Sequence, residues 1–179
     1  LLMPAAQPPH KFAGWLAPDR DRLAMCALAA QEHSFIQVSD YEIRRGGRSY
    51  TVETLRHLAG ENPGEEYSLL MGTDMFLTFT QWREWEEIGK MASLLVASRE
   101  EGEREALLKQ QKRLKEQGIS SRLLENPPLP ISSTAIRQEL RERGCTGKVP
   151  PKVLDYIRER GLYLHHPKEL SYLREYIRP

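Results

Sequence analysis

The stretch Tyr67-Ser68-Leu69-Leu70-Met71-Gly72-Thr73-Asp74 decides the fold of this 179-residue chain. Its first five residues are mostly large and apolar, which is typical of a short buried strand, and Gly72 ends the run. Polar residues follow at once. Because open α/β sheets bind ligands beyond the carboxyl ends of their strands, the stretch predicts both a strand and a ligand-facing rim.

Helix and strand patterns alternate on both sides of this strand. The predicted helices cover residues 19–31, 49–58, 82–91 and 103–117, and the predicted strands cover residues 35–43, 93–97 and 119–124. In the first helix, Leu23, Ala27 and Ala30 are expected on the apolar face. Such alternation predicts an α/β fold, with a doubly wound, mostly parallel sheet and helices on both faces.

The C-terminal third is predicted to be helical. Residues 126–130 read Asn-Pro-Pro-Leu-Pro, which cannot continue a strand, and the helix beyond them is expected to stop at Gly144. Pro150-Pro151 opens a short helix that ends near Gly161. Residues 170–178 are amphipathic. We expect them to pack on their own domain, and a contact between subunits of a homo-oligomer is the alternative.

Composition predicts one globular domain with a real core, since 40% of the residues are apolar and 28% are charged. The 26 basic and 25 acidic residues nearly cancel, so no global field attracts nucleic acid or an anionic membrane, and neither partner is expected. Cys26 and Cys145 are read as reduced thiols of a cytoplasmic protein. Neither a membrane-spanning stretch nor a signal peptide is visible in the sequence.

An anion site is predicted where Ser132, Ser133 and Thr134 lead into a helix. With Ser133 as the N-cap, Arg137 lies one turn further on the same side. Backbone N–H groups, hydroxyls and the positive helix end then gather beside a guanidinium, which suits a phosphate. The alternative is an ordinary capped helix with a solvated arginine.

Three segments place polar residues just after strands. His10 and Lys11 follow the apparent strand end Leu1 to Met3 and can donate to phosphate oxygens. Gly72 lets a ligand approach the backbone, and Asp74 can accept from ribose hydroxyls or cap the next helix. Arg99 can reach a phosphate or pair with a neighbouring glutamate. A solvated surface turn is the alternative for His10 and Lys11.

Two tryptophans lie in the segment Thr80-Gln81-Trp82-Arg83-Glu84-Trp85. One of them can cover the core while the other offers a flat face on which a heteroaromatic ring stacks. Two core tryptophans are the competing interpretation.

Taken together, these segments resemble the bacterial nicotinate-nucleotide adenylyltransferase family, of the nucleotidyltransferase superfamily with a Rossmann-like fold. The matching segments, in the family's order, are Pro8 to Lys11, Arg45 to Leu55, Gly72 to Asp74, the Trp82 segment, and Ile131 to Arg137. The resemblance implies transfer of the adenylyl group of ATP to nicotinate mononucleotide, which yields pyrophosphate and deamido-NAD in NAD biosynthesis. It also implies Mg²⁺, which accompanies ATP and needs no dedicated protein metal site.

The same resemblance assigns roles to individual residues. Arg137 and Lys11 are catalytic. The residues implied for the nicotinate mononucleotide are Thr51, Trp82, Arg83, His10 and Arg99, and those implied for ATP are Gly72, Asp74, Ser132, Ser133, Thr134 and Arg137. In this scheme Trp82 stacks on the pyridine ring, while Thr51 and the backbone near Arg83 receive the carboxylate.

One departure from the family is its first motif, G-x-F-D-P-x-H-x-G-H, which this sequence lacks. Because Leu1 to Met3 read as the end of a strand, we infer that the first βα unit is missing from the sequence. Residues 1–163 are then one N-terminally truncated domain, and 164–179 are a tail with room for a short helix. The alternatives are an adenylyltransferase for phosphopantetheine or a flavin precursor, or a non-catalytic nucleotide-binding fragment.

We expect Arg137→Ala to lower turnover far more than it weakens binding of the mononucleotide, because the main partner of this guanidinium is charge that grows during transfer. The loss should be on the order of 10²-fold in rate. Steady-state kinetics on a full-length version that carries the first motif measures this. An unchanged rate would remove Arg137 from the catalytic site.

Overall fold

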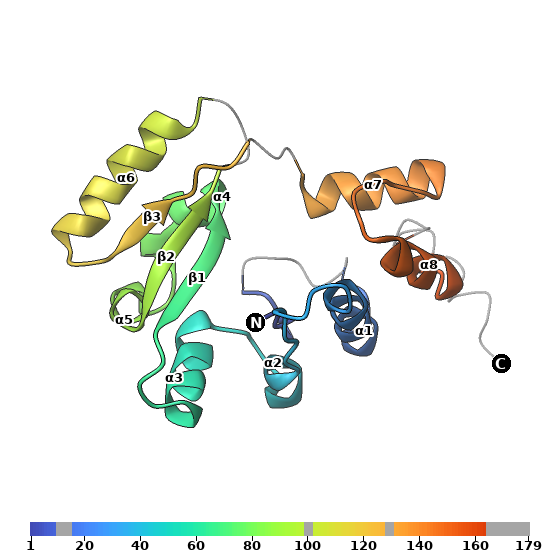
Figure 1. Cartoon of the computed structure of the whole chain (residues 1–179), viewed down its shortest axis with the longest axis horizontal. Coiled ribbons are helices and arrows are strands. Elements are labelled where there is room, and N and C mark those ends of the chain that lie inside the picture. Colours follow the sequence, from blue (N-terminus) through green and yellow to red (C-terminus); the bar gives the residue numbers. More distant parts are fainter. Residues whose placement is uncertain (10–15, 99–101, 128–130, 164–179) are drawn as a thin grey trace, which may run out of the picture. The chain divides into compact units, whose positions relative to one another are not determined.

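The structure, a computed structural model, describes residues 1–9, 16–98, 102–127 and 131–163 (Figure 1). Its contacts divide the chain into two compact units. The central unit is Tyr50–Pro130, and the terminal unit combines Leu1–Ser49 with Ile131–Pro179. The predicted tail, residues 164–179, lies outside the described residues.

A parallel three-stranded sheet organises the central unit. Its strands β1 (Tyr67–Gly72), β2 (Ala92–Ala97) and β3 (Ser121–Leu123) lie in the order β1-β2-β3. The register pairs Leu69 with Leu94 and Met71 with Val96. The strands predicted at 67–71 and 93–97 are confirmed, as is the parallel sheet, while β3 is shorter than predicted.

One face of this sheet carries the core of the central unit. Four α-helices and one 3₁₀ helix contribute to the core: α3 (Thr51–Glu61), α4 (Thr73–Leu77), η2 (Phe79–Gln81), α5 (Trp85–Met91) and α6 (Arg104–Glu116). Phe76 and Phe79 are completely buried against the strand residues Leu94 and Val96. Such interlocked apolar side chains fix where each strand ends, and so where the polar residues beyond it lie.

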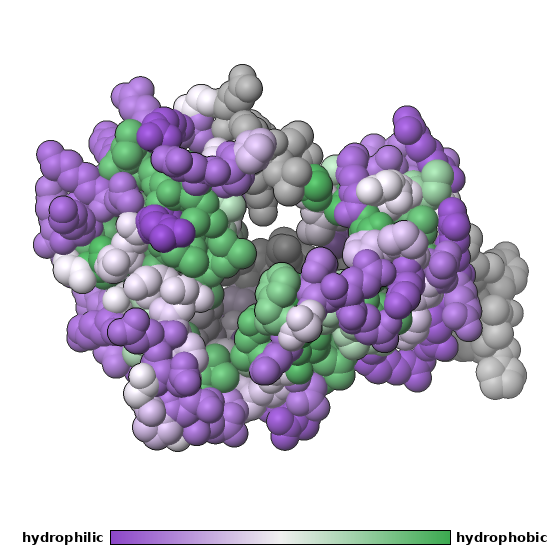
Figure 2. Space-filling model, viewed as in Figure 1, coloured by the Kyte–Doolittle hydropathy of each residue, from purple (hydrophilic) through white to green (hydrophobic). Residues whose placement is uncertain are grey.

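The opposite face of the sheet is apolar and partly open. Leu70 pairs in register with Leu95, and both point away from the core, because side chains alternate between the faces of a strand. Leu70 is 66% exposed. Figure 2 shows green surface where Figure 1 draws these strands.

The terminal unit is mostly helical. It contains α1 (Asp19–Ala30), α2 (Tyr41–Arg45), α7 (Ser133–Arg143) and α8 (Pro151–Glu159). Leu140, Val153 and Ile157 form its buried cluster. Helix α1 also meets α8 through a buried carboxylate: Asp21 accepts hydrogen bonds from Tyr156 Oη at 2.7 Å and from Arg160 Nε at 3.2 Å. The Tyr156 bond is the largest of several influences that hold the pKa of Asp21 below its ordinary value.

Glycines end the two C-terminal helices as the sequence predicted. Gly144 follows α7 with φ of 63°, and Gly161 follows α8 with φ of 61°. Only glycine adopts this left-handed conformation without strain, so it stops a helix cleanly. Val153 and Ile157 of α8 are buried, and Leu154 is partly buried against the same cluster.

The strand predictions in the terminal unit were wrong. Residues 35–43 do not form a strand: Phe35 is 82% exposed, Val38 makes only an isolated bridge with Leu2, and α2 begins at Tyr41. The reason is local, since Ser39 Oγ accepts the N–H of Tyr41 at 3.2 Å and so favours a helix start. Leu1 to Met3 likewise contribute only that bridge.

The apolar face predicted for α1 was also displaced. Ala27 is exposed, whereas Met25, Leu28 and Ala29 pack against the core. The buried stripe begins with Asp21 and Arg22, so a count of apolar residues alone finds the wrong side of the helix. Similarly, α5 begins at Trp85 and not at Trp82, because Glu84 adopts a left-handed conformation with φ of 53°.

Every helix among the described residues is too short or too polar to traverse a lipid bilayer.

Packing of α5 predicts a large effect for Gly89→Ala. A Cβ at this position would lie 2.5 Å from Cγ1 of Ile119, which is 4% exposed and β-branched. Such overpacking should destabilise the fold by about 1–3 kcal/mol. Gly60→Ala is the matched control, because it also lies in a helix but has open space around it, and it should be neutral or stabilising. Urea denaturation compares them, and equal stabilities would contradict this packing.

Candidate active site

The carboxyl ends of the three parallel strands meet at one edge of the central sheet, and polar side chains follow them. Thr73 comes directly after β1, and Ser98 comes directly after β2. Both hydroxyls donate to the same oxygen, Glu103 Oε2, at 2.6 Å and 3.0 Å. Asn126, which follows β3, donates through Nδ2 to the carbonyl of Ser98 at 3.1 Å. A single hydrogen-bonded network therefore ties the three strand ends together.

A cavity of about 580 Å³ opens at this edge. Val96, Leu107 and Leu123 give it apolar walls, while Ser98 and Asn126 supply polar groups. The Oδ1 atom of Asn126 is buried and has no hydrogen-bond partner among the described residues. Since a buried acceptor without a partner is costly, this atom is suited to receive a donor from a ligand.

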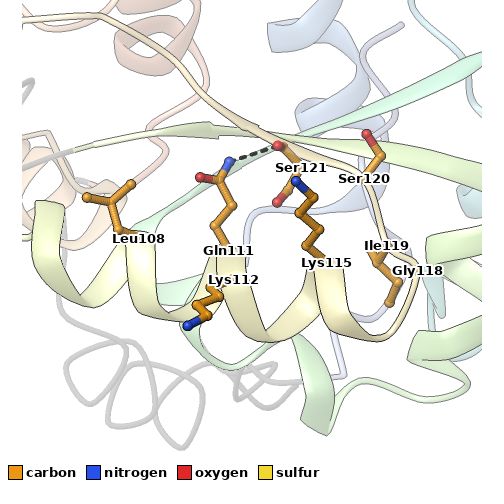
Figure 3. Close-up of a pocket in the computed structure, with 8 residues that line it drawn as sticks. All are labelled: Leu108, Gln111, Lys112, Lys115, Gly118, Ile119, Ser120 and Ser121. Atoms are coloured by element: carbon orange, nitrogen blue, oxygen red, sulfur yellow. Dashed lines mark hydrogen bonds between the residues drawn. The ribbon is translucent and has the colours of Figure 1, made fainter.

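A larger cavity, of about 710 Å³, lies elsewhere in the central unit, between α6 and the start of β3 (Figure 3). Gln111 reaches across it and donates to the carbonyl of Ser121 at 2.8 Å, while Lys112 extends away from the strand. Gly118 to Ser121 line this cavity at the amino end of β3. In open α/β sheets ligands bind at the carboxyl ends, so we assign the site to the smaller cavity.

Gly72 and Asp74 lie at the same edge, as predicted from the sequence. Gly72 precedes α4 in an extended conformation, and Asp74 is exposed in the first turn of that helix. The Asp74 side chain does not cap α4; its backbone carbonyl instead accepts from Thr78. The capping role weighed for the Asp74 carboxylate is therefore not seen, and contact with ribose hydroxyls stays a prediction.

A second group of predicted residues gathers where α3 begins. Thr51 is the first residue of α3, and the preceding Tyr50 provides no side-chain cap. The guanidinium of Arg83 lies 4.5 Å from the centre of the Tyr50 ring, and its Nη1 is 3.2 Å from Glu53 Oε1. The start of α3 thus combines a hydroxyl, backbone donors of the first turn and a nearby cation, which suits a carboxylate.

Both tryptophans contact the core. The Trp82 ring lies 5.6 Å from that of Phe79, and the Trp85 ring lies 6.2 Å from it. Each tryptophan is only partly buried. Both tryptophans therefore contact the core, and stacking of a heteroaromatic ring on the accessible part of Trp82 stays a prediction.

Ion pairs brace the turn that carries Trp82. Glu84 pairs with Arg56 of α3 and lies 3.6 Å from Arg83. The hydrogen bond from Arg56 is the main cause that holds the pKa of Glu84 below its ordinary value of 4.5. The turn between η2 and α5 is thereby attached to α3 by charge as well as by packing.

In the terminal unit, Ser132 and not Ser133 is the N-cap of α7. The Oγ atom of Ser132 accepts the N–H of Ala135 at 3.1 Å, and Ser132 has the extended backbone that a cap requires. Ser133 and Thr134 are exposed in the first turn. Arg137 is half-buried, with its guanidinium 5.9 Å from the centre of the Tyr163 ring. The hydroxyls of Ser133 and Thr134 thus lie in the first turn of α7 and Arg137 follows on the same helix, while the anion site itself stays a prediction.

Three predicted site residues, His10, Lys11 and Arg99, lie outside the described residues. Conversely, the sequence analysis missed Glu103 and Asn126. Glu103 was read as an ordinary helix start, and Asn126 as part of a proline-rich connection. The bond between Glu103 and Thr73 and the bond between Asn126 and Ser98 each span about 30 residues of sequence, which a local pattern does not reveal.

Comparisons with known proteins agree with this arrangement. The family model described as cytidylyltransferase-like matches residues 1–139. A probable nicotinate-nucleotide adenylyltransferase of Synechococcus sp. (strain JA-2-3B'a(2-13)) is 41% identical over 165 residues, which cover 92% of this chain and 81% of the relative. This chain belongs to the nicotinate-nucleotide adenylyltransferase family, within the cytidylyltransferase-like proteins.

Other members of the family support the assignment. A probable nicotinate-nucleotide adenylyltransferase of Geobacter sulfurreducens is 37% identical and covers 92% of this chain, while the chain covers 84% of that relative. The solved Plasmodium falciparum nicotinic acid mononucleotide adenylyltransferase complexed with NaAD matches with a TM-score of 0.69. The match covers 90% of this chain and 80% of that one at 18% identity, so it shows the shared fold.

The depressed pKa of Glu84 predicts a pH-dependent contribution to stability. Because its folded pKa lies below 4.5, the Arg56 pair stabilises the fold above that pH and is lost as the pH falls through the lower folded value. We therefore expect Glu84→Gln to lower the thermal midpoint at pH 7, and to have a much smaller effect at pH 3. A difference between the proteins that stays constant with pH would contradict the ion pair.

Proposed function

We propose that this protein transfers the adenylyl group of ATP to nicotinate mononucleotide, and thereby makes deamido-NAD and pyrophosphate in NAD biosynthesis. The observation that carries the proposal is the 41% identity to a probable nicotinate-nucleotide adenylyltransferase over 92% of the chain. Local features also support the proposal. The start of α3, with Trp82 nearby, offers groups for the nicotinate, the strand-end cavity offers groups for ATP, and the start of α7 offers groups for phosphate.

The reaction needs positioning and charge stabilisation. The phosphate of the mononucleotide is already anionic near neutral pH, so its oxygen attacks the α-phosphorus of ATP without a strong general base. The new P–O bond forms as the bond from the α-phosphorus to the bridging oxygen breaks, and pyrophosphate leaves with that electron pair. Arg137, Lys11 and the N-terminus of α7 then stabilise the growing negative charge.

Mg²⁺ enters this scheme as part of the substrate. We propose that the ion arrives bound to the phosphates of ATP and neutralises charge on the leaving pyrophosphate. The protein contributes the cations and helix N–H groups that receive the remaining charge.

The nicotinate ring is proposed to bind where α3 begins. Thr51 and the first-turn N–H groups of α3 receive the carboxylate, and the partly exposed Trp82 ring stacks on the pyridine. The ion pairs of Arg83 with Glu53 and Glu84 hold its side chain beside the start of α3. Arg83 therefore contributes to nicotinate binding mainly through its backbone and through the position of its guanidinium over the Tyr50 ring.

ATP is proposed to use the carboxyl edge of the sheet. Gly72 and Asp74 line the ribose side, and the unpartnered Oδ1 of Asn126 offers an acceptor for the exocyclic amine of adenine.

We further propose the cytoplasm as the compartment, since both cysteines of the described chain, Cys26 and Cys145, are free.

Acceptor choice tests the proposed function. Nicotinate mononucleotide should be preferred over nicotinamide mononucleotide by at least about tenfold in kcat/KM, because the amide forfeits a hydrogen bond to a charged group. Trp82→Ala should raise KM for the mononucleotide and leave KM for ATP nearly unchanged. Competing both acceptors in one reaction and separating the products by mass gives the first ratio directly.

Trp85→Ala is the matched control, since Trp85 also packs on Phe79 but has no assigned ligand. It should lower stability and leave both KM values unchanged. Equal use of the two acceptors would defeat the nicotinate assignment. A defect specific to ATP in Trp82→Ala would mean that adenine, and not pyridine, stacks on this ring.

A further inference from the structure

Glu103, which directly precedes α6, is hydrogen-bonded to the ends of two strands at once. Its Oε2 atom accepts the hydroxyl of Thr73 at 2.6 Å and the hydroxyl of Ser98 at 3.0 Å. Thr73 follows β1 and Ser98 follows β2, and these two strands are parallel neighbours in the sheet. A single carboxylate oxygen therefore fixes the spacing between the two strand ends.

The side chain of Glu103 is committed to these strand ends and not to its own helix. Within the described residues it makes no capping hydrogen bond to α6. Thr73 is only 2% exposed, so its hydroxyl contacts Glu103 and is out of reach of a ligand. Hydrogen bonds to an ionised acceptor are stronger than those between neutral groups, and both contacts of Glu103 are of this kind.

Each strand end that Glu103 holds carries groups that the proposed function assigns to ATP. Thr73 lies within Gly72–Asp74, which is proposed to line the ribose. Ser98 lines the strand-end cavity, and its carbonyl accepts the side-chain N–H of Asn126 at 3.1 Å. Two sides of the proposed ATP site therefore depend on the carboxylate of Glu103.

We propose that Glu103 is a positioning residue, which raises the affinity for ATP by holding the ends of β1 and β2 at a fixed spacing. This inference rests on the proposed function. It predicts an effect on one substrate only, because the mononucleotide is assigned to Thr51 and Trp82, which belong to α3 and to the turn after η2.

Two substitutions of Glu103 test the inference in the full-length protein. Glu103→Ala removes both hydrogen bonds, so KM for ATP should rise by about tenfold, as for one lost bond to a charged group. KM for nicotinate mononucleotide should be unchanged. Glu103→Gln retains an oxygen that can accept both hydroxyls, so it should keep KM for ATP within about twofold of the wild-type value.

Thr73→Val tests the same contact from the strand side. It removes one of the two hydrogen bonds and keeps a β-branched side chain, so it should raise KM for ATP less than Glu103→Ala does. In the Glu103→Ala background it should add less than about a twofold increase, because both changes remove the same contact. Thr73→Val alone serves as the test if Glu103→Ala does not fold.

Two other positions of α6 provide matched controls. Glu105 is exposed in the first turn, so Glu105→Ala removes the same charge from this end of the helix and leaves the network intact. Gln110 is 8% exposed and donates to the carbonyl of Phe76 at 3.4 Å, so Gln110→Ala should lower the thermal midpoint. Both variants should leave KM for ATP unchanged.

The outcomes separate this inference from the proposed function. A rise in KM for ATP alone, which Glu103→Gln avoids and which is not additive with Thr73→Val, supports the positioning role. An unchanged KM for ATP, an equal rise for both substrates, or the same rise in Glu103→Gln or Gln110→Ala overturns it. Wild-type protein that forms no deamido-NAD overturns the proposed function itself.

Discussion

The carboxylate of Glu103 connects the ends of two parallel strands by hydrogen bonds, and the candidate site depends on that connection. One oxygen accepts the hydroxyl of Thr73 after β1 and the hydroxyl of Ser98 after β2. The carbonyl of Ser98 in turn accepts a hydrogen bond from the side chain of Asn126, which follows β3. The apolar residues beneath this edge set the positions of the strands. The hydrogen-bonded network then fixes the polar side chains that line the cavity, Ser98 and Asn126.

Buried charged groups have a comparable role in the terminal unit. Asp21 connects α1 to α8 through Tyr156 and Arg160, and the adjacent Arg22 holds backbone carbonyls on both sides of residues 7–16. Burial of a charge is tolerated only where hydrogen bonds compensate for lost water. Such groups therefore occur where the geometry of the backbone or of a helix contact must be specific.

The sequence predicted the elements whose signals are local. The apolar run that ends at Gly72, the strand before Ser98 and the glycine stops at Gly144 and Gly161 were all correct, because each depends on neighbouring residues. Family resemblance supplied the roles of Thr51 and Trp82. The structure then showed Thr51 at the first position of α3, and Trp82 half-buried against Phe79.

The errors arose where polar side chains make hydrogen bonds that a pattern of apolar residues does not reveal. Asp21 and Arg22 lead the buried face of α1, and Ser39 starts a helix where a strand was expected. Adjacent serines before α7 left the capping residue ambiguous until the bond from Ala135 to Ser132 identified it. Glu103 and Arg22 were overlooked as anchors, since only the folded backbone brings their partners within reach.

The central claim is adenylyl transfer to a nicotinate nucleotide, and product analysis tests it most directly. Purified full-length protein would receive Mg²⁺-ATP together with nicotinate mononucleotide, phosphopantetheine and flavin mononucleotide at equal concentrations, with products identified by mass. The account predicts deamido-NAD and pyrophosphate in equal amounts. Adenylylated phosphopantetheine or a flavin dinucleotide as the main product, or no transfer to any acceptor, would contradict it.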